Sequence, residues 1–223
     1  DDVHPDPQWL SRLRAAMGTS NAECAFGKIL PRWMGERPAW LGRFFLPQLA
    51  LLDYGDAPVL ATSDQHLFYG ANVAMTKAAL ARVGPFNVNL GNRGTQIGGE
   101  EDTDMFNRLL AAGVRIAYAP DAVVHHKVPV ERMRLGYFRR WHFDHGAAEA
   151  HVTPPGAAGR GVLGVPFWAI RGLLGHGAGY LAALGSPDVE RRLKHQMKVM
   201  YGLGMVSAKL RMALRGEDGC RRS

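Results

Sequence analysis

Residues 98–126 constrain the fold of this 223-residue chain more than any other stretch. A glycine pair leads into four acidic residues, a helical pattern of apolar residues, a glycine stop, and an alternating strand pattern that ends in two histidines. Acidic residues suit the first turn of a helix because they face its positive end, and Gly113 stands where a left-handed helix cap would lie. The stretch predicts an amphipathic helix that leads directly into a strand.

The first 130 residues alternate between helical and strand patterns, which is typical of an α/β fold. Turn and cap signals divide them into these expected elements: a helix capped by Asp6, begun at Pro7 and ended by Gly18, a strand at 24–30, an irregular segment at 31–58, a strand at 66–75 with a glycine break, a helix capped by Thr76 and ended by Gly84, and short strands at 114–118 and 121–126.

The chain after residue 130 is helical in pattern. We expect an aromatic and basic helix at 130–151, a Pro/Gly linker at 153–161 and a final helix from 186 onward. Residues 161–184 are apolar and long enough to span a bilayer, but Arg171 near their centre would be costly there, so we favour a buried or membrane-surface hairpin. The expected parts are an α/β domain at 1–130, an aromatic and basic helix at 131–152, and a basic, membrane-associated helical tail at 153–223.

The net charge of +7 is unevenly placed. Residues 1–131 hold 12 Lys and Arg against 14 Asp and Glu, whereas residues 132–223 hold 15 against 6. The basic part could meet anionic lipid, another acidic surface or nucleic acid; no nucleic-acid-binding motif is present, so we expect no nucleic-acid partner. Two distant cysteines and no visible signal peptide favour a cytoplasmic location, at the inner face of the cell membrane.

Three polar clusters could converge on one site: Asp1-Asp2, the acidic residues 101–104, and His126 backed by Arg140-Trp141. Paired carboxylates can hold Mg²⁺ or Mn²⁺, which neutralises charge on a leaving diphosphate. Another carboxylate can take a proton from an attacking hydroxyl, and arginines can grip phosphate oxygens. Each cluster alone is more often a solvated or structural feature, so the site depends on all of them facing a shared hollow.

In order and spacing, these residues resemble family 2 glycosyltransferases of the GT-A type, over residues 1–146. The matching segments are residues 1–10 (DDVHPDPQWL), similar to the family's Asp-x-Asp region and following helix; 68–75 (FYGANVAM), similar to its GAN strand; 83–86 (VGPF), similar to the turn after the next helix; 99–104 (GEEDTD), similar to its GED block; and 118–129 (YAPDAVVHHKVP), similar to its histidine-bearing strand.

The resemblance implies a partial GT-A domain (Rossmann-like) with a C-terminal helical extension, and a nucleotide-diphospho-sugar donor, with a UDP-sugar expected. It implies Asp2 and His126 as ligands of Mg²⁺ or Mn²⁺, with Asp1 beside the ribose or diphosphate of the donor. Arg140 and Trp141 resemble the Arg-Trp of the Gln-x-x-Arg-Trp motif of processive members, and would also contact the donor.

The implied reaction is displacement at the anomeric carbon with inversion. Asp102 would be the base that activates the acceptor hydroxyl, and Glu101 would help to shape the acceptor site. The acceptor would be a glycan or a lipid-linked glycan, in polysaccharide or cell-envelope synthesis. Tyr137 stands where processive members carry Gln, which argues against processive transfer.

One half of the family pattern is missing from this chain. The nucleotide-binding strands would precede Asp1, so we expect the chain to be the C-terminal portion of a longer enzyme and to be inactive by itself. The alternative is a non-catalytic module, derived from a truncated glycosyltransferase, that binds a glycan or a membrane.

Overall fold

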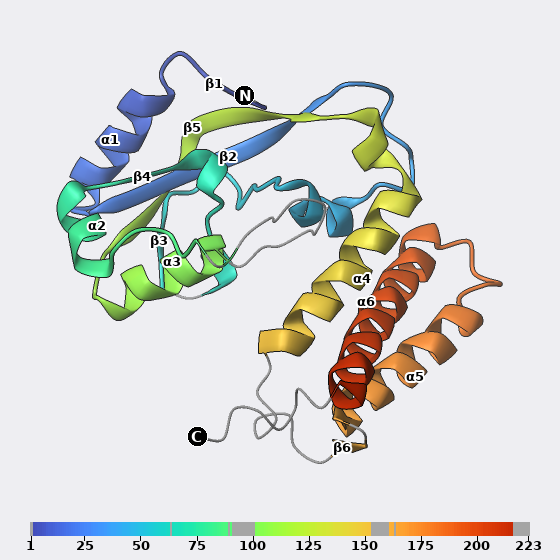
Figure 1. Cartoon of the computed structure of the whole chain (residues 1–223). Coiled ribbons are helices and arrows are strands. Elements are labelled where there is room, and N and C mark those ends of the chain that lie inside the picture. The colour runs from blue at the N-terminus through green and yellow to red at the C-terminus, as the bar shows by residue number, and fades with distance from the viewer. Residues whose placement is uncertain are drawn as a thin grey trace, which may run out of the picture. The chain divides into compact units, whose positions relative to one another are not determined.

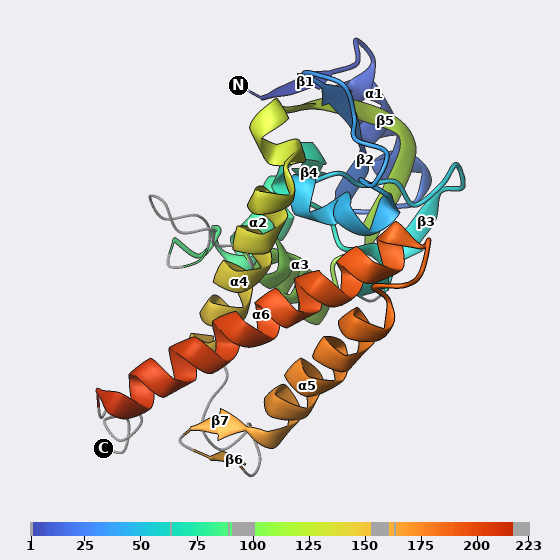
Figure 2. The ribbon, with the colours of Figure 1, turned by 90° about the vertical axis from the view of Figure 1, so that its right-hand side faces the viewer.

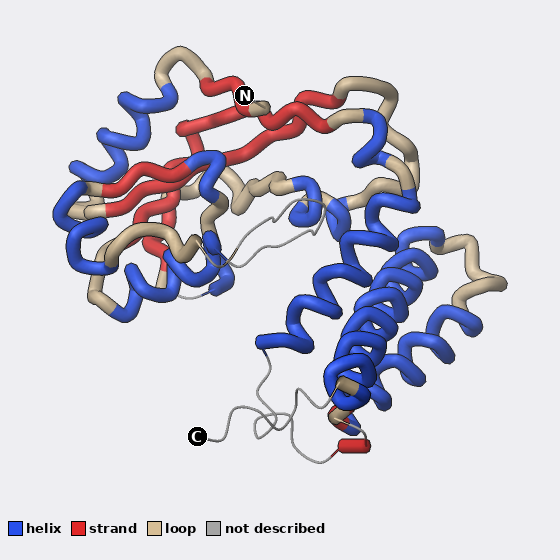
Figure 3. Tube along the Cα trace, viewed as in Figure 1, coloured by secondary structure: helices blue, strands red, loops and turns tan. Residues whose placement is uncertain are grey.

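The computed structural model describes residues 2–62, 64–88, 90, 101–152, 161–162 and 164–215. The chain divides into two compact units, which we call the sheet unit (Asp1–Arg37, Phe45–Gly91 and Gly99–Met133) and the helical unit (Pro38–Phe44, Asn92–Gly98 and Arg134–Ser223). Figure 1 traces their elements, and Figure 3 shows where helices and strands fall along the chain. The glycine pair at 98–99, Glu100 and all but the last residue of the expected linker lie outside the described residues.

The sheet unit is built on two long parallel strands, β2 (Cys24–Trp33) and β5 (Ile116–Val128). Strand β4 (Val73–Met75) pairs antiparallel with the start of β2. On the other side of β5, β3 (Val59–Ala61) pairs with its beginning and β1 (Val3–Pro5) with its end, both antiparallel. Strand β1 therefore places the first described residues beside the last residues of β5.

The two faces of this sheet are packed differently. Helix α1 (Trp9–Thr19) covers one face through a layer of mostly small side chains: Leu13, Ala22, Ala25, Ala117, Ala119 and Ala122. The other face carries aromatic rings, because successive side chains of a strand point to opposite sides. There Phe26 contacts Phe68, and Phe68 meets Phe106 of helix α3 (Glu101–Ala111) with 5.5 Å between ring centroids.

Two of the expected elements of the sheet unit were wrong in their bounds. Helix α1 begins at Trp9 with Gln8 as its N-cap, and the Asp6 carboxylate instead lies 3.4 Å from His125 Nε2. The expected strand at 66–75 is a strand only at β4, because Gly70–Asn72 forms a 3₁₀ turn that turns the Asn72 side chain into the interior.

The two short strands expected at 114–118 and 121–126 are one continuous strand, β5. Pro120 lies within this strand, where the register between β2 and β5 shifts, between Gly27 and Ile29. A proline is tolerated at such a bulge because no ladder bond needs its missing N–H. The expected strand at 24–30 is confirmed as part of β2, and helix α2 (Lys77–Val83) begins as expected, with Thr76 Oγ1 accepting a hydrogen bond from Ala79 N.

Within its described residues, the helical unit contains helices α4 (Leu135–Val152), α5 (Phe167–Ala182) and α6 (Val189–Leu214). Helix α6 packs against both α4 and α5, as Figure 2 shows. A Cβ at Gly146 would overlap the Tyr201 carbonyl, and one at Gly204 would overlap the Phe143 carbonyl, so these two glycines let the backbones of α4 and α6 meet. A two-stranded hairpin, β6 (Gly161–Val162) and β7 (Val165–Pro166), precedes α5.

The described helices include none that is both long enough and apolar enough to cross a membrane. The expected helix at 130–151 begins only at Leu135, after a 3₁₀ turn at Val130–Met133, and the final helix begins at Val189 after its cap Asp188. The expected mixed α/β fold with a C-terminal helical extension is confirmed. The division into 1–130, 131–152 and 153–223 stays a prediction.

Candidate functional site

The structure brings Asp2 and His126 together at the end of the sheet. The pairing of β1 with β5 sets Val3 opposite His126, and Lys127 N donates to the Asp2 carbonyl at 2.8 Å. These backbone contacts hold the Asp2 side chain beside the buried His126 ring, with Oδ2 3.3 Å from Nε2. Two residues 124 positions apart in the sequence thus form one polar pair.

The hydrogen bond of the other His126 nitrogen shows which ring nitrogen carries the hydrogen. Nδ1 lies 2.9 Å from the Leu49 carbonyl oxygen, and a carbonyl can only accept, so Nδ1 carries the hydrogen. Nε2 of the neutral ring then points a lone pair at the Asp2 carboxylate. Such an arrangement needs a proton or a cation between the two groups. When a proton occupies Nε2, partial burial of Asp2 opposes its charge, but the hydrogen bond and charge of the protonated His126 outweigh it and hold the pKa of Asp2 below its ordinary value.

This pair fits a divalent metal with few protein ligands. Mg²⁺ and Mn²⁺ prefer carboxylate oxygens, and Mg²⁺ sites commonly use one or two carboxylates, with substrate phosphates completing the shell. The hydrogen bond from Nδ1–H to a backbone carbonyl is the arrangement that orients ligating histidines. No group of three or more His, Cys, Asp or Glu suited to a metal occurs among the described residues; Asp1, the other predicted contributor, lies outside them.

A hollow of about 420 Å³ opens beside Asp2. Its remaining lining comes from the end of β2 and from the segment after His126: Met34, Lys127, Pro129, Val130, Glu131 and Arg132. Two cations, one further carboxylate and three apolar side chains therefore border Asp2. Neither His126 nor Asp102 lines this hollow, so the expectation that all the clusters face one shared hollow stays a prediction.

Asp102 and Glu101 begin helix α3, as expected from the acidic stretch. The Asp102 carboxylate lies against Gly70, where a Cβ would come within 2.9 Å of Oδ1. Burial raises the pKa of Asp102, a backbone hydrogen bond from Gly70 opposes that rise, and the charge of Glu101 adds to it. Glu101 Oε2 is buried and has no hydrogen-bond partner among the residues that the structure describes. A half-buried carboxylate with a raised pKa is suited to take up a proton.

Asn72, next to Gly70, has a structural role that the sequence did not indicate. Its Oδ1 accepts from Trp9 Nε1 at 2.7 Å, and its Nδ2 donates to the carbonyls of Lys28 and Ala122, both at 2.8 Å. One buried amide thus joins α1, β2 and β5. The Lys28 carbonyl is available because it lies in the β2 bulge, where the ladder is interrupted.

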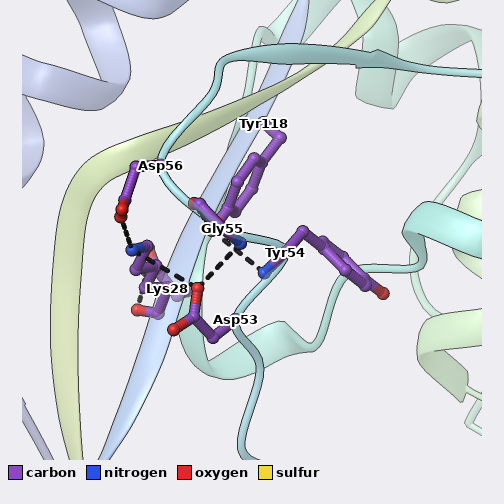
Figure 4. A network of polar contacts seen from close by, with 7 residues as sticks. Lys28, Asp53, Tyr54, Gly55, Asp56 and Tyr118 are labelled. Carbon is purple, nitrogen blue, oxygen red and sulfur yellow. Dashed lines mark hydrogen bonds and ion pairs between the residues drawn. The ribbon is translucent and has the colours of Figure 1, made fainter.

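Sequence reasoning also missed the polar network in Figure 4, which anchors the loop after residue 52. Lys28 Nζ lies 3.3 Å from Asp53 and 2.5 Å from Asp56. The Tyr118 hydroxyl donates to the Gly55 carbonyl and accepts from Tyr54 N. A signal was present, because residues 53–56 (DYGD) have the composition of a turn, but nothing in the sequence paired them with a lysine in a distant strand.

Arg140 and Trp141 lie on α4, in the helical unit. Arg140 Nε is 3.4 Å from the Asp144 carboxylate, and the Trp141 ring stacks on His145 with 4.8 Å between centroids. Their predicted contact with a donor stays a prediction, as does the role of Asp1.

Comparison with known proteins shows which proteins the chain resembles, which the geometry alone does not. Residues 1–145 match the family model of glycosyl transferase family group 2. The chain is 27% identical over 216 residues to the succinoglycan biosynthesis protein ExoM of Rhizobium meliloti (strain 1021). That alignment covers 94% of this chain and 64% of ExoM, so the chain spans somewhat less than two thirds of this relative.

No solved structure matches the chain. The family model nevertheless covers well over half of it, including the residues of β1, the Gly70–Asn72 turn, the start of α3 and His126. The chain belongs to glycosyl transferase family group 2.

Proposed function

We propose that this chain is part of a glycosyltransferase that moves a sugar from a nucleotide-diphospho-sugar to an acceptor hydroxyl in polysaccharide synthesis. Family membership and the similarity to a succinoglycan biosynthesis protein support the reaction class. The structural observation that carries the proposal is the Asp2–His126 pair, with Nδ1 of the histidine hydrogen-bonded to Leu49 and Nε2 facing the carboxylate.

Asp2 and His126 would hold a divalent metal in this proposal. When bound, the metal would neutralise the charge that develops on the leaving diphosphate. Lys127 and Arg132 line the hollow beside Asp2, where their charges would attract the donor's phosphate oxygens. We expect a UDP-sugar as donor, and a panel of UDP-, GDP- and dTDP-sugars would identify it.

Asp102 would be the catalytic base. Its carboxylate would take the proton from the acceptor hydroxyl as the oxygen bonds to the anomeric carbon and the bond to the diphosphate breaks, which inverts the configuration. The raised pKa favours proton uptake, and the α3 N-terminus still favours the charged form that must accept the proton. Glu101, directly before it, would border the acceptor.

Metal binding is the first test, made on the natural protein that contains this chain. His126→Gln should weaken Mn²⁺ binding, measured by calorimetry, by about tenfold or more, because one of two protein ligands is lost. The matched control is His125→Gln, since His125 lies next to His126 on β5 and faces a different carboxylate, Asp6, at 3.4 Å. Unchanged Mn²⁺ affinity in His126→Gln, or full sugar transfer in excess EDTA, would remove the metal from the proposal.

The base is tested by Asp102→Asn, which should lower kcat by roughly 10²- to 10⁴-fold with little change in donor KM. Asp104→Asn is the control on the same helix, because Asp104 is paired with Arg108 at 2.8 Å. Proton NMR of the product should show the anomeric configuration opposite to that of the donor. Retained activity in Asp102→Asn would exclude it as the base, and a retained configuration would exclude inversion.

The same assay compares the natural protein with residues 1–223 alone, for which we expect no sugar transfer. If neither transfers sugar from any donor while both still bind glycan, the non-catalytic module is the correct reading.

A further inference from the structure

Helix α5 exposes its large apolar side chains. Its outward face is formed at helical spacing by four residues that are 46% to 67% exposed: Phe167, Trp168, Leu174 and Leu181. Leu184, just after the helix, is 52% exposed. Arg171 is the only Asp, Glu, Lys or Arg in the helix, and it is also exposed.

The inward side of α5 carries both large and small residues. Ile170 packs against the buried cluster of the unit, and Tyr180 contacts Gln196 of α6. A Cβ at Gly179 would overlap the His195 ring of α6, and Gly202 of α6 faces Leu173 of α5, with 3.2 Å left for a Cβ. The buried residue of α5 is Ala169. Helix α5 is therefore apolar on its outward side as well as on its inward side, with glycines at its close contacts with α6. A surface helix in water would carry polar residues on the outward side, whereas a helix in an apolar surrounding would not.

The helix cannot use this face to cross a bilayer. Its 16 residues extend about 24 Å, which is shorter than the roughly 30 Å of a hydrocarbon core. An arginine in the middle of the outward face would also lie in hydrocarbon. A helix lying in the plane of the membrane surface meets neither difficulty, because tryptophan and arginine side chains suit the boundary between acyl chains and headgroups.

The charge of the residues around α5 indicates which kind of surface its apolar face would contact. Between residues 167 and 215 the chain has eight Lys and Arg against two Asp and Glu. Four cations of α6 and the residue after it are exposed: Arg191, Lys198, Arg211 and Arg215. A cationic helix beside an exposed apolar face complements anionic headgroups over acyl chains, whereas a second copy of the same cationic hairpin would be repelled.

We propose that α5 lies in the surface of an anionic membrane, with Phe167, Trp168, Leu174 and Leu181 among the acyl chains and the cations of α6 near the headgroups. The proposal does not rest on sugar transfer, since lipid binding is measured without donor or acceptor. It concerns the helical unit by itself.

The test is co-sedimentation of the natural protein with two vesicles, one of phosphatidylcholine alone and one of phosphatidylcholine with phosphatidylglycerol. The protein should bind the anionic vesicle more strongly, and added salt should reduce the difference. Leu174→Glu/Leu181→Glu should reduce the partition coefficient by about a hundredfold, because removing each leucine from the acyl chains costs roughly tenfold or more. Arg171→Gln should weaken binding to the anionic vesicle alone.

The matched control is Leu10→Glu in the sheet unit, because Leu10 is 61% exposed on α1 and should leave lipid binding unchanged. Circular dichroism should show the helical content of all variants intact, since every substituted side chain is exposed. Failure of the unmutated protein to bind either vesicle would overturn the proposal. So would a double variant that binds as well as the unmutated protein, or a dimer in light scattering that only the double variant dissociates.

Discussion

Helices α3 and α5 differ in how much of their large apolar surface their own unit covers. Helix α3 buries Met105, Phe106 and Leu109 completely, whereas the buried residue of α5 is an alanine. The sequence of α3 is explained by packing against the sheet in water. Packing within its own unit does not explain the large apolar residues on the outward face of α5. These residues are the reason to expect a binding partner for that face.

Each unit contains buried polar atoms without a hydrogen-bond partner among the described residues, but Asn72 and His142 differ from one another. In the sheet unit, Asn72 makes three hydrogen bonds and is fully satisfied. In the helical unit, His142 Nε2 is buried without a hydrogen-bond partner among the described residues, and the ring stacks on Phe44 at 6.0 Å between centroids. Stability should therefore be sensitive to loss of the polar group at Asn72, and to gain of a charge at His142.

The largest effect is expected from Asn72→Ala. It leaves Trp9 Nε1 and two backbone carbonyls without their partners, and each buried unsatisfied group costs about 1 to 3 kcal/mol. The free energy of unfolding should fall by about 4 kcal/mol, measured by urea denaturation. Asn107→Ala, on the exposed side of α3, should change it by less than about 0.5 kcal/mol. Equal effects of the two substitutions would mean that Asn72 does not tie the sheet unit together.

Acid should weaken the helical unit through His142. Burial, and then the nearby charge of His145, lower the pKa of His142 from 6.5 to about 4. A folded-state pKa below the unfolded value means that protons bind preferentially to the unfolded chain, so stability is lost as the pH falls from about 6.5 towards 4. The loss approaches about 3 kcal/mol. His142→Phe should flatten the dependence of the urea midpoint on pH.

The control for that titration is His151→Phe, at an exposed position of the same helix. It should leave the pH dependence as it is in the unmutated protein. If His142→Phe also leaves it unchanged, the acid sensitivity has another source.

The effect of added side-chain volume on stability is tested at two glycines of the helical unit. Gly204→Ala places a methyl group on the Phe143 carbonyl and should force α4 and α6 apart, lowering the free energy of unfolding by about 1 to 3 kcal/mol. Gly175→Ala, on α5, has open space around the new Cβ and should raise it by up to about 1 kcal/mol through helix propensity. Opposite signs would confirm that close backbone approach, and not glycine content, matters at the crossing.

The smallest effect concerns Asp102. Because burial raises its pKa, the folded state favours the protonated carboxyl, and the stability gained from that is lost as the pH rises through the raised pKa. Asp102→Asn, which removes the charge, should raise the Tm slightly at pH 7 and leave it unchanged at pH 3. Asp104→Asn should instead lower the Tm at pH 7, since it breaks the pair with Arg108. A lower Tm for Asp102→Asn at pH 7 would contradict the assigned burial cost.

Much of the architecture could be predicted from local patterns. The acidic start of α3, the Thr76 cap and the strand at 24–30 follow from capping chemistry and periodicity, which act over a few residues. The continuity of β5 and the start of α1 were predicted wrongly, because the pairing of β5 with β2 and the contact of Asp6 with His125 join distant segments. Local rules do not include such partners.

The same distinction applies to the candidate site. The residue types of Asp2, Asp102 and His126 could be selected from the sequence and the family resemblance. The bond between His126 and Leu49, the contact of Asp102 with Gly70, and the roles of Asn72 and Lys28 could not, because each depends on a fold that joins distant segments. The exposed face of α5 was hidden for another reason: an apolar run does not reveal which of its sides a neighbour covers.

Asn72 has a consequence for synthesis of the chain. Its side chain joins α1, which is made before it, to Ala122, which is made 50 residues after it. On the ribosome, Trp9 and Lys28 can bond to Asn72 as soon as it is made. The hydrogen bond to Ala122 cannot form until β5 has left the exit tunnel. The sheet unit must therefore wait, incomplete, for the strand that also brings His126.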